Sequence, residues 1–274
     1  SGYENIGQTW STPAAALVLG HHATDPVLIV GGGYDACEDD DKLAPACGSQ
    51  KGSSVYVINA DTGALIKTFG TGGTGAITGS VAGDVTLVDR NFDGYVDHGY
   101  FADTAGGLYR IDFVDPATLA QKTSTGWALT KLAQTTSGAG RKFLYGPAAL
   151  PSAGKVYLTI GSGDRERPLA INYPYLDQVQ NRAYMFIDLF ATTGLPVNLD
   201  DPTKMDDFTA GTVCGQTTSV GSNGWFFDLN AGRGEQTVTS TTIFGGLVFF
   251  STNHPVPETV ESCASNLGKA RGYA

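Results

Sequence analysis

Short apolar runs alternate with polar turns along the whole chain. Each run is rich in β-branched and aromatic residues and is bounded by Gly, Asp, Asn or Pro, which is typical of β-strands. We therefore predict strands within residues 26–33, 53–60, 83–89, 106–113, 155–163, 182–190, 224–230 and 243–253. Helical periodicity is absent, apart from a turn or two near Tyr175 to Gln180.

Several of these strands share one local pattern. An aromatic residue (Tyr56, Tyr109, Tyr184 or Trp225) opens the strand, which ends in an acidic or Asn turn that commonly contains Gly. Asp tolerates turn geometry and Gly adopts positive φ, so we interpret each pattern as an outer β-hairpin. Repeated hairpins at irregular spacing predict an all-β fold, a modified β-propeller with irregular blades and long decorating loops. The alternative is a two-sheet sandwich, which a chain of 274 residues would overfill.

Composition supports this interpretation and limits the classes of partner. The chain has 37 Gly and only 16% charged residues, against a typical ~25%, as expected of a turn-rich β protein. We expect a single domain over residues 1–274, the C-terminal part of a larger protein. The net charge of −10 argues against nucleic acid and anionic membranes as partners and favours cations. The chain has no apolar stretch of ~18 residues, so we do not expect it to insert directly into a membrane.

Four cysteines form a near pair and a far pair. We predict the disulfides Cys37–Cys47 and Cys214–Cys263, because the near pair closes a polar loop with little apolar core of its own. Disulfides favour an oxidising, extracytoplasmic location. Four buried free thiols are the alternative.

The segment DRNFDGYVD has the ligand pattern of a calcium loop. Ca²⁺ takes six to eight oxygen ligands, which a compact loop supplies from alternate residues. The predicted ligands are Asp89, Asn91, Asp93, the Tyr95 carbonyl and Asp97, at positions 1, 3, 5, 7 and 9 of the loop. Gly94, at position 6, supplies the sharp turn.

The loop differs from a helix-loop-helix site in two respects. Position 12 is Tyr100 instead of a bidentate Glu, and strands flank the loop in place of helices. We therefore expect weak binding, with a Kd on the order of 10⁻⁵ to 10⁻³ M, as in extracellular calcium modules. The alternative is a solvated acidic hairpin turn.

Other motifs are better explained as structure. The GTGGTG stretch from Gly70 lacks the following helix of a dinucleotide site. The acidic residues 39–41 suit a solvated loop. In GSGDRERPL, Ser162 lacks the GxSxG context of a nucleophile, and an Asp–Arg pair that fixes a loop between blades explains the motif better. No catalytic or cofactor-binding constellation is predicted, and we expect a protein that is not an enzyme.

Several motifs in one order carry a resemblance that covers nearly the whole chain. They are WSTP at Trp10, GGGYDACED at Gly31, YVINADTG at Tyr56, VDRNFDGYVDHGYFADTAGGLYRIDF at Val88, GSGDRERPL at Gly161, GWFFDLNAGRGE at Gly224 and the late Cys263. The sequence resembles the C-terminal propeller domain of the PilY family, the type IV pilus tip-associated adhesins and biogenesis factors. Ala102 departs from the Gly expected before Asp103, and no RGD tripeptide occurs.

The resemblance implies a calcium loop between strands of a propeller. It also implies passage through the periplasm and display at the pilus tip or outer cell surface. Partners would be minor pilins or the tip complex, with a host or abiotic surface possible. Calcium occupancy would regulate pilus extension against retraction, and with it twitching motility and surface attachment.

Two other functions compete with the pilus role. One is a pyrroloquinoline quinone-dependent dehydrogenase, which is also a calcium-containing propeller. The other is a carbohydrate-binding propeller, which requires exposed aromatic side chains around a pocket, and the chain has only three Trp.

Overall fold

The computed structural model describes residues 2–39, 47–48, 50–70, 76–191, 193–210, 218–219, 221–256 and 268–274. Within these ranges the chain is almost entirely β, and the one helix is a 3-10 turn, η1, at Ala36–Asp39. No helix in the described ranges is long and apolar enough to cross a lipid bilayer. The predicted all-β class is confirmed.

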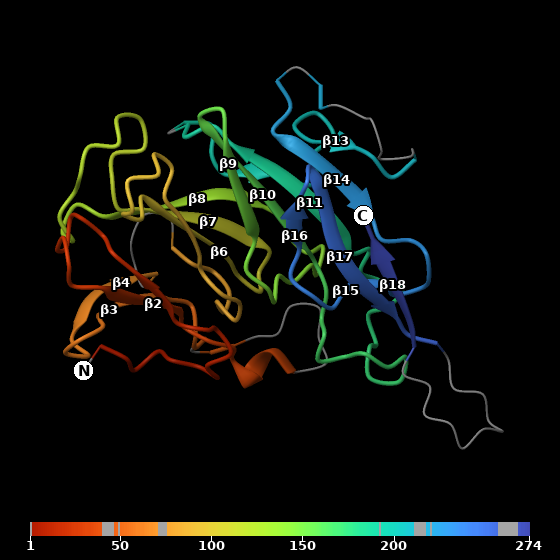
Figure 1. Ribbon diagram of the computed structural model, residues 1–274. Coiled ribbons are helices and arrows are strands. Elements are labelled where there is room, and N and C mark those ends of the chain that lie inside the picture. The colour runs from red at the N-terminus through yellow and green to blue at the C-terminus, as the bar shows by residue number, and fades with distance from the viewer. Residues whose placement is uncertain are drawn as a thin grey trace.

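The described strands form four sheets, which follow one another in chain order except that β12 returns to the second sheet after β11 of the third (Figure 1). Sheet 1 has the order β1-β2-β3-β4, with strands Ala14–Ala16, Val27–Gly31, Val55–Asn59 and Leu65–Phe69. Sheet 2 has the order β12-β8-β7-β6-β5, with strands Val197–Asn198, Ala128–Gln134, Gly107–Asp112, His98–Ala102 and Thr86–Val88. Figure 1 shows sheet 1 in red and orange on the side of the N-terminus.

The second half of the chain builds the other two sheets. Sheet 3 has the order β13-β14-β11-β10-β9, with strands Asp206–Asp207, Gly224–Asp228, Arg182–Asp188, Lys155–Gly161 and Ala148–Ser152. In sheet 4, β17 pairs with β15 and β16, and β18 also pairs with β17; these strands are Leu247–His254, Gln236–Thr237, Thr242–Phe244 and Lys269–Tyr273. Its strands are blue in Figure 1, on the side of the C-terminus.

The sheets pack face to face as propeller blades do. One core cluster lies between sheets 1 and 2 and includes Val27, Val57, Phe101 and Ile111. A second lies between sheets 2 and 3 and includes Tyr100, Leu108, Leu158, Tyr184 and Phe226. Strands β6 and β7 are consequently buried along their whole length, on both faces. A smaller cluster around Ala183 and Phe250 joins sheets 3 and 4.

One edge strand of each sheet contacts an edge strand of the neighbouring sheet. Strands β1, β5, β9 and β16 stand at or beside the edge of their sheets, and contacts join β1 to β5, β5 to β9 and β9 to β16. This succession of inner strands around a common axis is the arrangement of a β-propeller, in which blades surround a central channel.

Two of the predicted hairpins are wrong. Tyr56 and Tyr109 do lie in strands that turn back onto their neighbours, β3 onto β4 and β7 onto β8. After β11, however, the chain crosses to sheet 2, where β12 runs parallel to β8. After β14 it crosses to sheet 4, where β15 pairs with β17. A local turn pattern does not reveal which sheet the chain enters next, because pairing depends on where distant strands lie.

One predicted disulfide is confirmed. Cys37 at η1 is bonded to Cys47, with 5.7 Å between the Cα atoms. The proposed Cys214–Cys263 pair lies outside the described residues.

Candidate metal centre

The predicted calcium loop is the connection between β5 and β6. Val88 pairs with His98, so residues 89–97 form the loop that joins the two antiparallel strands. Val88 and His98 are both buried, which anchors the base of the loop in the core, while Asn91, Asp93 and Gly94 at its tip are exposed. The strand scaffold expected from the sequence is therefore confirmed.

Aspartate side chains organise the loop from within. Asp89 accepts hydrogen bonds from the backbone N–H of Asp93 at 3.2 Å and of Gly94 at 2.8 Å. Asp93 accepts from the backbone N–H of Tyr95 at 2.9 Å and from the Asn91 amide at 3.0 Å. The bond from Tyr95 to Asp93 closes an Asx turn, and the two longer bonds to Asp89 fold the candidate ligands Asp89, Asn91 and Asp93 into one compact loop.

Two residues of the loop have positive φ. Gly94 has φ 91°, in agreement with its predicted role at the sharp turn. Phe92 has φ 59°, and its side chain is 78% exposed. A bulky residue in the left-handed region costs roughly 1–2 kcal/mol. The strain at Phe92 shows that the loop conformation is imposed by its neighbours and its internal hydrogen bonds.

Asp97 differs from the other two candidate carboxylates because it is completely buried. Its Oδ2 accepts the backbone N–H of Arg90 at 2.8 Å, but its Oδ1 has no hydrogen-bond partner among the described residues. Burial raises the pKa of Asp97, and the charges of Asp93 and Asp89 raise it further, against the lowering effects of the Arg90 N–H and His98. A buried carboxylate oxygen without a partner is costly, and a cation would satisfy it.

The structure does not bring the three carboxylates into mutual contact. Among the described residues, one set of three His, Cys, Asp or Glu places its ligand atoms within 4.8 Å of one another, and it is Asp35, Cys37 and Cys47. Asp89, Asp93 and Asp97 are therefore more widely spaced than that. The donor set nevertheless fits a hard cation, because it consists of oxygens and includes the unsatisfied Oδ1 of Asp97.

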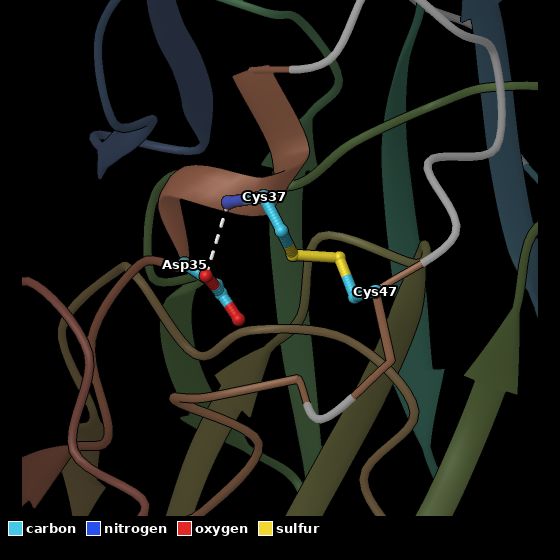
Figure 2. A group of neighbouring side chains, drawn as sticks. All are labelled: Asp35, Cys37 and Cys47. Carbon is cyan, nitrogen blue, oxygen red and sulfur yellow. Dashed lines mark hydrogen bonds between the residues drawn. A yellow bond between two sulfur atoms is a disulfide. The ribbon is translucent and has the colours of Figure 1, made fainter.

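The Asp35 group has no free sulfur ligands. Figure 2 shows Cys37 and Cys47 joined by their disulfide, with Asp35 accepting the backbone N–H of Cys37 at 3.0 Å. The other Asp35 oxygen accepts the backbone N–H of Lys51 at 2.6 Å. Since a thiolate, and not a disulfide sulfur, is the metal ligand, this cluster is a structural turn.

The candidate loop touches both neighbouring sheets. The backbone N–H of Val96 donates to the Leu17 carbonyl at 2.9 Å, directly after β1 of sheet 1. The Tyr95 hydroxyl donates to the carbonyl of Ala23 at 3.3 Å. On the other side, the Arg90 guanidinium lies 4.0 Å from the ring centroid of Phe190, which follows β11 of sheet 3. The loop thus sits where three sheets meet.

A buried charge network continues inward from the loop. His98 bonds through Nδ1 to Asp112 at 2.9 Å, and Arg110 donates to the same carboxylate at 2.6 Å. Arg110 also donates to both oxygens of Asp188 in sheet 3, at 2.9 and 2.8 Å, and Tyr100 donates to Asp188 at 2.9 Å. This network cannot be predicted from a local motif, because Asp188 lies far along the chain from Arg110.

The GSGDRERPL motif forms a structural charge cluster, as the sequence predicted. Ser162 is buried and donates to Asn181, so it is not presented as a nucleophile. Asp164 lies 3.1 Å from the Lys142 ammonium and 3.6 Å from Arg167. Burial raises the pKa of the adjacent Glu166 to about 7, and the charge of Asp164 contributes.

Comparisons with known proteins were made for the whole chain. The model of the PilY1 beta-propeller domain matches residues 5–154, which is more than half of the chain. A search of curated proteins found no match. Among solved structures, the crystal structure of the Pseudomonas aeruginosa PilY1 C-terminal domain matches with a TM-score of 0.64 at 18% identity. The match covers 92% of this chain and 57% of that one, and at this identity it shows the fold alone.

The matched range, residues 5–154, includes the β5–β6 loop and all of sheet 1. The solved structure has the same fold over nearly all the described sheets. Because the family model matches more than half of the chain, the chain belongs to the PilY1 beta-propeller domain family of type IV pilus-associated proteins.

Proposed function

We propose that the β5–β6 loop binds Ca²⁺ through Asp89, Asn91, Asp93, the Tyr95 carbonyl and Asp97. The observation that carries the proposal is the buried Oδ1 of Asp97, which lacks a partner among the described residues. Cation binding would satisfy this oxygen and offset the repulsion between Asp97 and the other two carboxylates.

Calcium at this place would act on the junction between sheets. The loop forms a hydrogen bond to the segment after β1, and Arg90 packs on Phe190, which follows β11 of sheet 3. A change in the loop conformation would therefore affect contacts with both neighbouring sheets. A ligand that binds only the ordered loop stabilises the folded state by mass action. The calcium-bound domain would therefore present a more rigid surface at the β5–β6 edge than the calcium-free domain.

The biological role that we propose is control of the type IV pilus. Calcium occupancy of the loop regulates pilus extension against retraction, and so twitching motility and surface attachment. The partners are the minor pilins or the tip complex, and the protein is displayed at the pilus tip or outer cell surface. The family membership supports a pilus-associated role, and the Cys37–Cys47 disulfide agrees with an extracytoplasmic location. No observation favours the quinone dehydrogenase alternative.

An Asp97→Asn strain tests the role in the cell. Asn preserves the side-chain volume and the acceptor for the Arg90 N–H but removes the charge that a calcium ion needs. We expect reduced piliation and twitching while the protein stays folded and exported. The matched control is Asp61→Asn, which removes an exposed turn carboxylate outside the loop. Normal piliation and motility in the Asp97→Asn strain would contradict the proposed role.

A further inference from the structure

A second candidate binding site lies at one end of the propeller axis. A cavity of about 430 Å³ is bordered by the segments that lead into one edge strand of each sheet, β1, β5, β9 and β16. Thr12 precedes β1, Asp84 precedes β5, Pro147 precedes β9 and Thr241 precedes β16. Because the strands β1, β5, β9 and β16 contact one another in succession, the cavity lies at one end of the inner strands of the propeller, and we call it the channel mouth.

One wall of this channel mouth is a stack of aromatic rings with an arginine. Trp10 stacks on Tyr34, with 4.4 Å between ring centroids and planes 12° apart. The Arg165 guanidinium lies 5.1 Å from the ring centroid of Trp10 and 5.1 Å from that of Tyr145. Arg165 also donates to the Tyr145 hydroxyl at 3.4 Å. Cation–π contacts of this kind hold a guanidinium in place, so less entropy is lost when its remaining donors bind a ligand.

The wall is accessible from the cavity. The Arg165 side chain is 37% exposed, and Trp10 and Tyr145 are half-buried. Glu166 lies 3.5 Å from Arg165 Nε, which leaves the guanidinium fork partly unused. The channel mouth therefore offers a fixed, charged hydrogen-bond donor beside aromatic surface.

Acceptors and hydroxyls stand on the rest of the rim. Asp84 is exposed and accepts the Thr12 backbone N–H at 2.6 Å through Oδ1, and among the described residues no donor is bonded to its other oxygen. Thr12 and Ser240 add exposed hydroxyl groups. The rim thus combines an anionic acceptor, a cationic donor and neutral groups that do both.

We propose that the channel mouth, built from Trp10, Asp84, Tyr145 and Arg165, binds a neutral saccharide. Sugars carry neighbouring hydroxyls that both donate and accept, which suits a carboxylate and a guanidinium facing one space. Their C–H faces pack on aromatic rings, which provide apolar surface with a polar edge. Asp84 disfavours an acidic ligand. The small number of aliphatic side chains around the cavity disfavours a lipid chain.

Saccharide binding at this mouth is a separate property from the proposed calcium site. The cavity residues lie mainly in the segments that precede β1, β5, β9 and β16, and none of them belongs to the β5–β6 loop. Trp10 and Arg165 are far apart in sequence, so the sequence alone does not show that they line one cavity.

The test uses the folded protein and defined sugars. Binding to a glycan array selects candidates, and titration followed by NMR with methyl glycosides of galactose, glucose, mannose, N-acetylglucosamine and glucuronic acid measures affinity. We expect a neutral glycoside to bind, and Arg165→Met and Asp84→Asn each to weaken it about tenfold or more, the effect of losing one charge-assisted hydrogen bond.

A matched control separates the site from general surface effects. Arg271 lies 5.7 Å from the ring centroid of Tyr273 on β18, so Arg271→Met removes an arginine with a similar aromatic contact away from the cavity. It should leave saccharide affinity unchanged. Asp84 is exposed, so Asp84→Asn remains informative even where Arg165→Met destabilises the fold. Absence of binding to every neutral glycoside would overturn the proposal. Unchanged affinity in Asp84→Asn, or binding of glucuronoside alone, would also overturn it.

Discussion

Two turns of this chain are both rich in acidic residues, but they differ in the interactions that their carboxylates make. In the turn at Asp35, both carboxylate oxygens accept backbone N–H groups, and a disulfide joins the neighbouring cysteines. In the β5–β6 loop, Asp89 and Asp93 also accept backbone N–H groups, but Asp97 keeps one buried oxygen without a partner in the described part of the chain. We therefore rank an unsatisfied buried oxygen above a crowd of ligand-type atoms as a sign of a metal site.

The largest expected effect is on the covalently held turn. Replacing Cys37 and Cys47 together with Ser should lower the free energy of unfolding by about 3 kcal/mol, the loop-entropy value for a bridge that spans ten residues. Denaturant unfolding measures this. The calcium affinity of the double variant should match that of the unaltered protein, and a large change in affinity would show that the two turns are not independent.

The second-largest expected effect is the gain in the free energy of unfolding that calcium gives through the β5–β6 loop. At calcium concentrations of ~100 Kd, the unaltered protein should gain about 2.7 kcal/mol of unfolding free energy over the chelated protein. Asp97→Asn should lose this gain. In chelator the same variant should be at least as stable as the unaltered protein, because it removes a buried charge.

Thermal unfolding with and without a chelator measures both parts of this prediction. Asp61→Asn is the control and should respond to calcium as the unaltered protein does. A calcium gain of full size in Asp97→Asn would remove Asp97 from the ligand set.

The smallest effect concerns backbone strain in the same loop. Phe92→Gly should raise the free energy of unfolding by about 1 kcal/mol, since Gly adopts φ 59° without steric cost. Phe244 on β16 is a matched control, because it is 77% exposed, against 78% for Phe92, and is not among the residues with positive φ. Phe244→Gly should instead lower stability by roughly 0.5–1 kcal/mol, as Gly does within a strand. If both variants changed the free energy of unfolding in the same direction, the proposed strain at Phe92 would be refuted.

The sequence predicts local features of this molecule well. Gly94 at positive φ, the strands around the β5–β6 loop and the Cys37–Cys47 bridge are all set by neighbouring residues, and the structure confirms them. The five ligands themselves stay a prediction.

Features that depend on distant strands could not be predicted. The crossing after β11 to a parallel pairing with β8 leaves no trace in a turn motif. Asp97 is buried because neighbouring sheets cover it, and its position in the loop pattern does not predict this burial. The wall of Trp10, Tyr145 and Arg165 likewise exists only after the sheets meet at their common axis.

Calorimetric titration of the purified protein with Ca²⁺ tests the central claim most directly. The account predicts one site, with a Kd on the order of 10⁻⁵ to 10⁻³ M. It also predicts that Asp97→Asn weakens binding by about tenfold or more, the effect of losing one charged ligand, while Asp61→Asn leaves it unchanged. Absence of calcium binding, or the same affinity in Asp97→Asn as in the unaltered protein, would contradict the assignment of the β5–β6 loop as a calcium site.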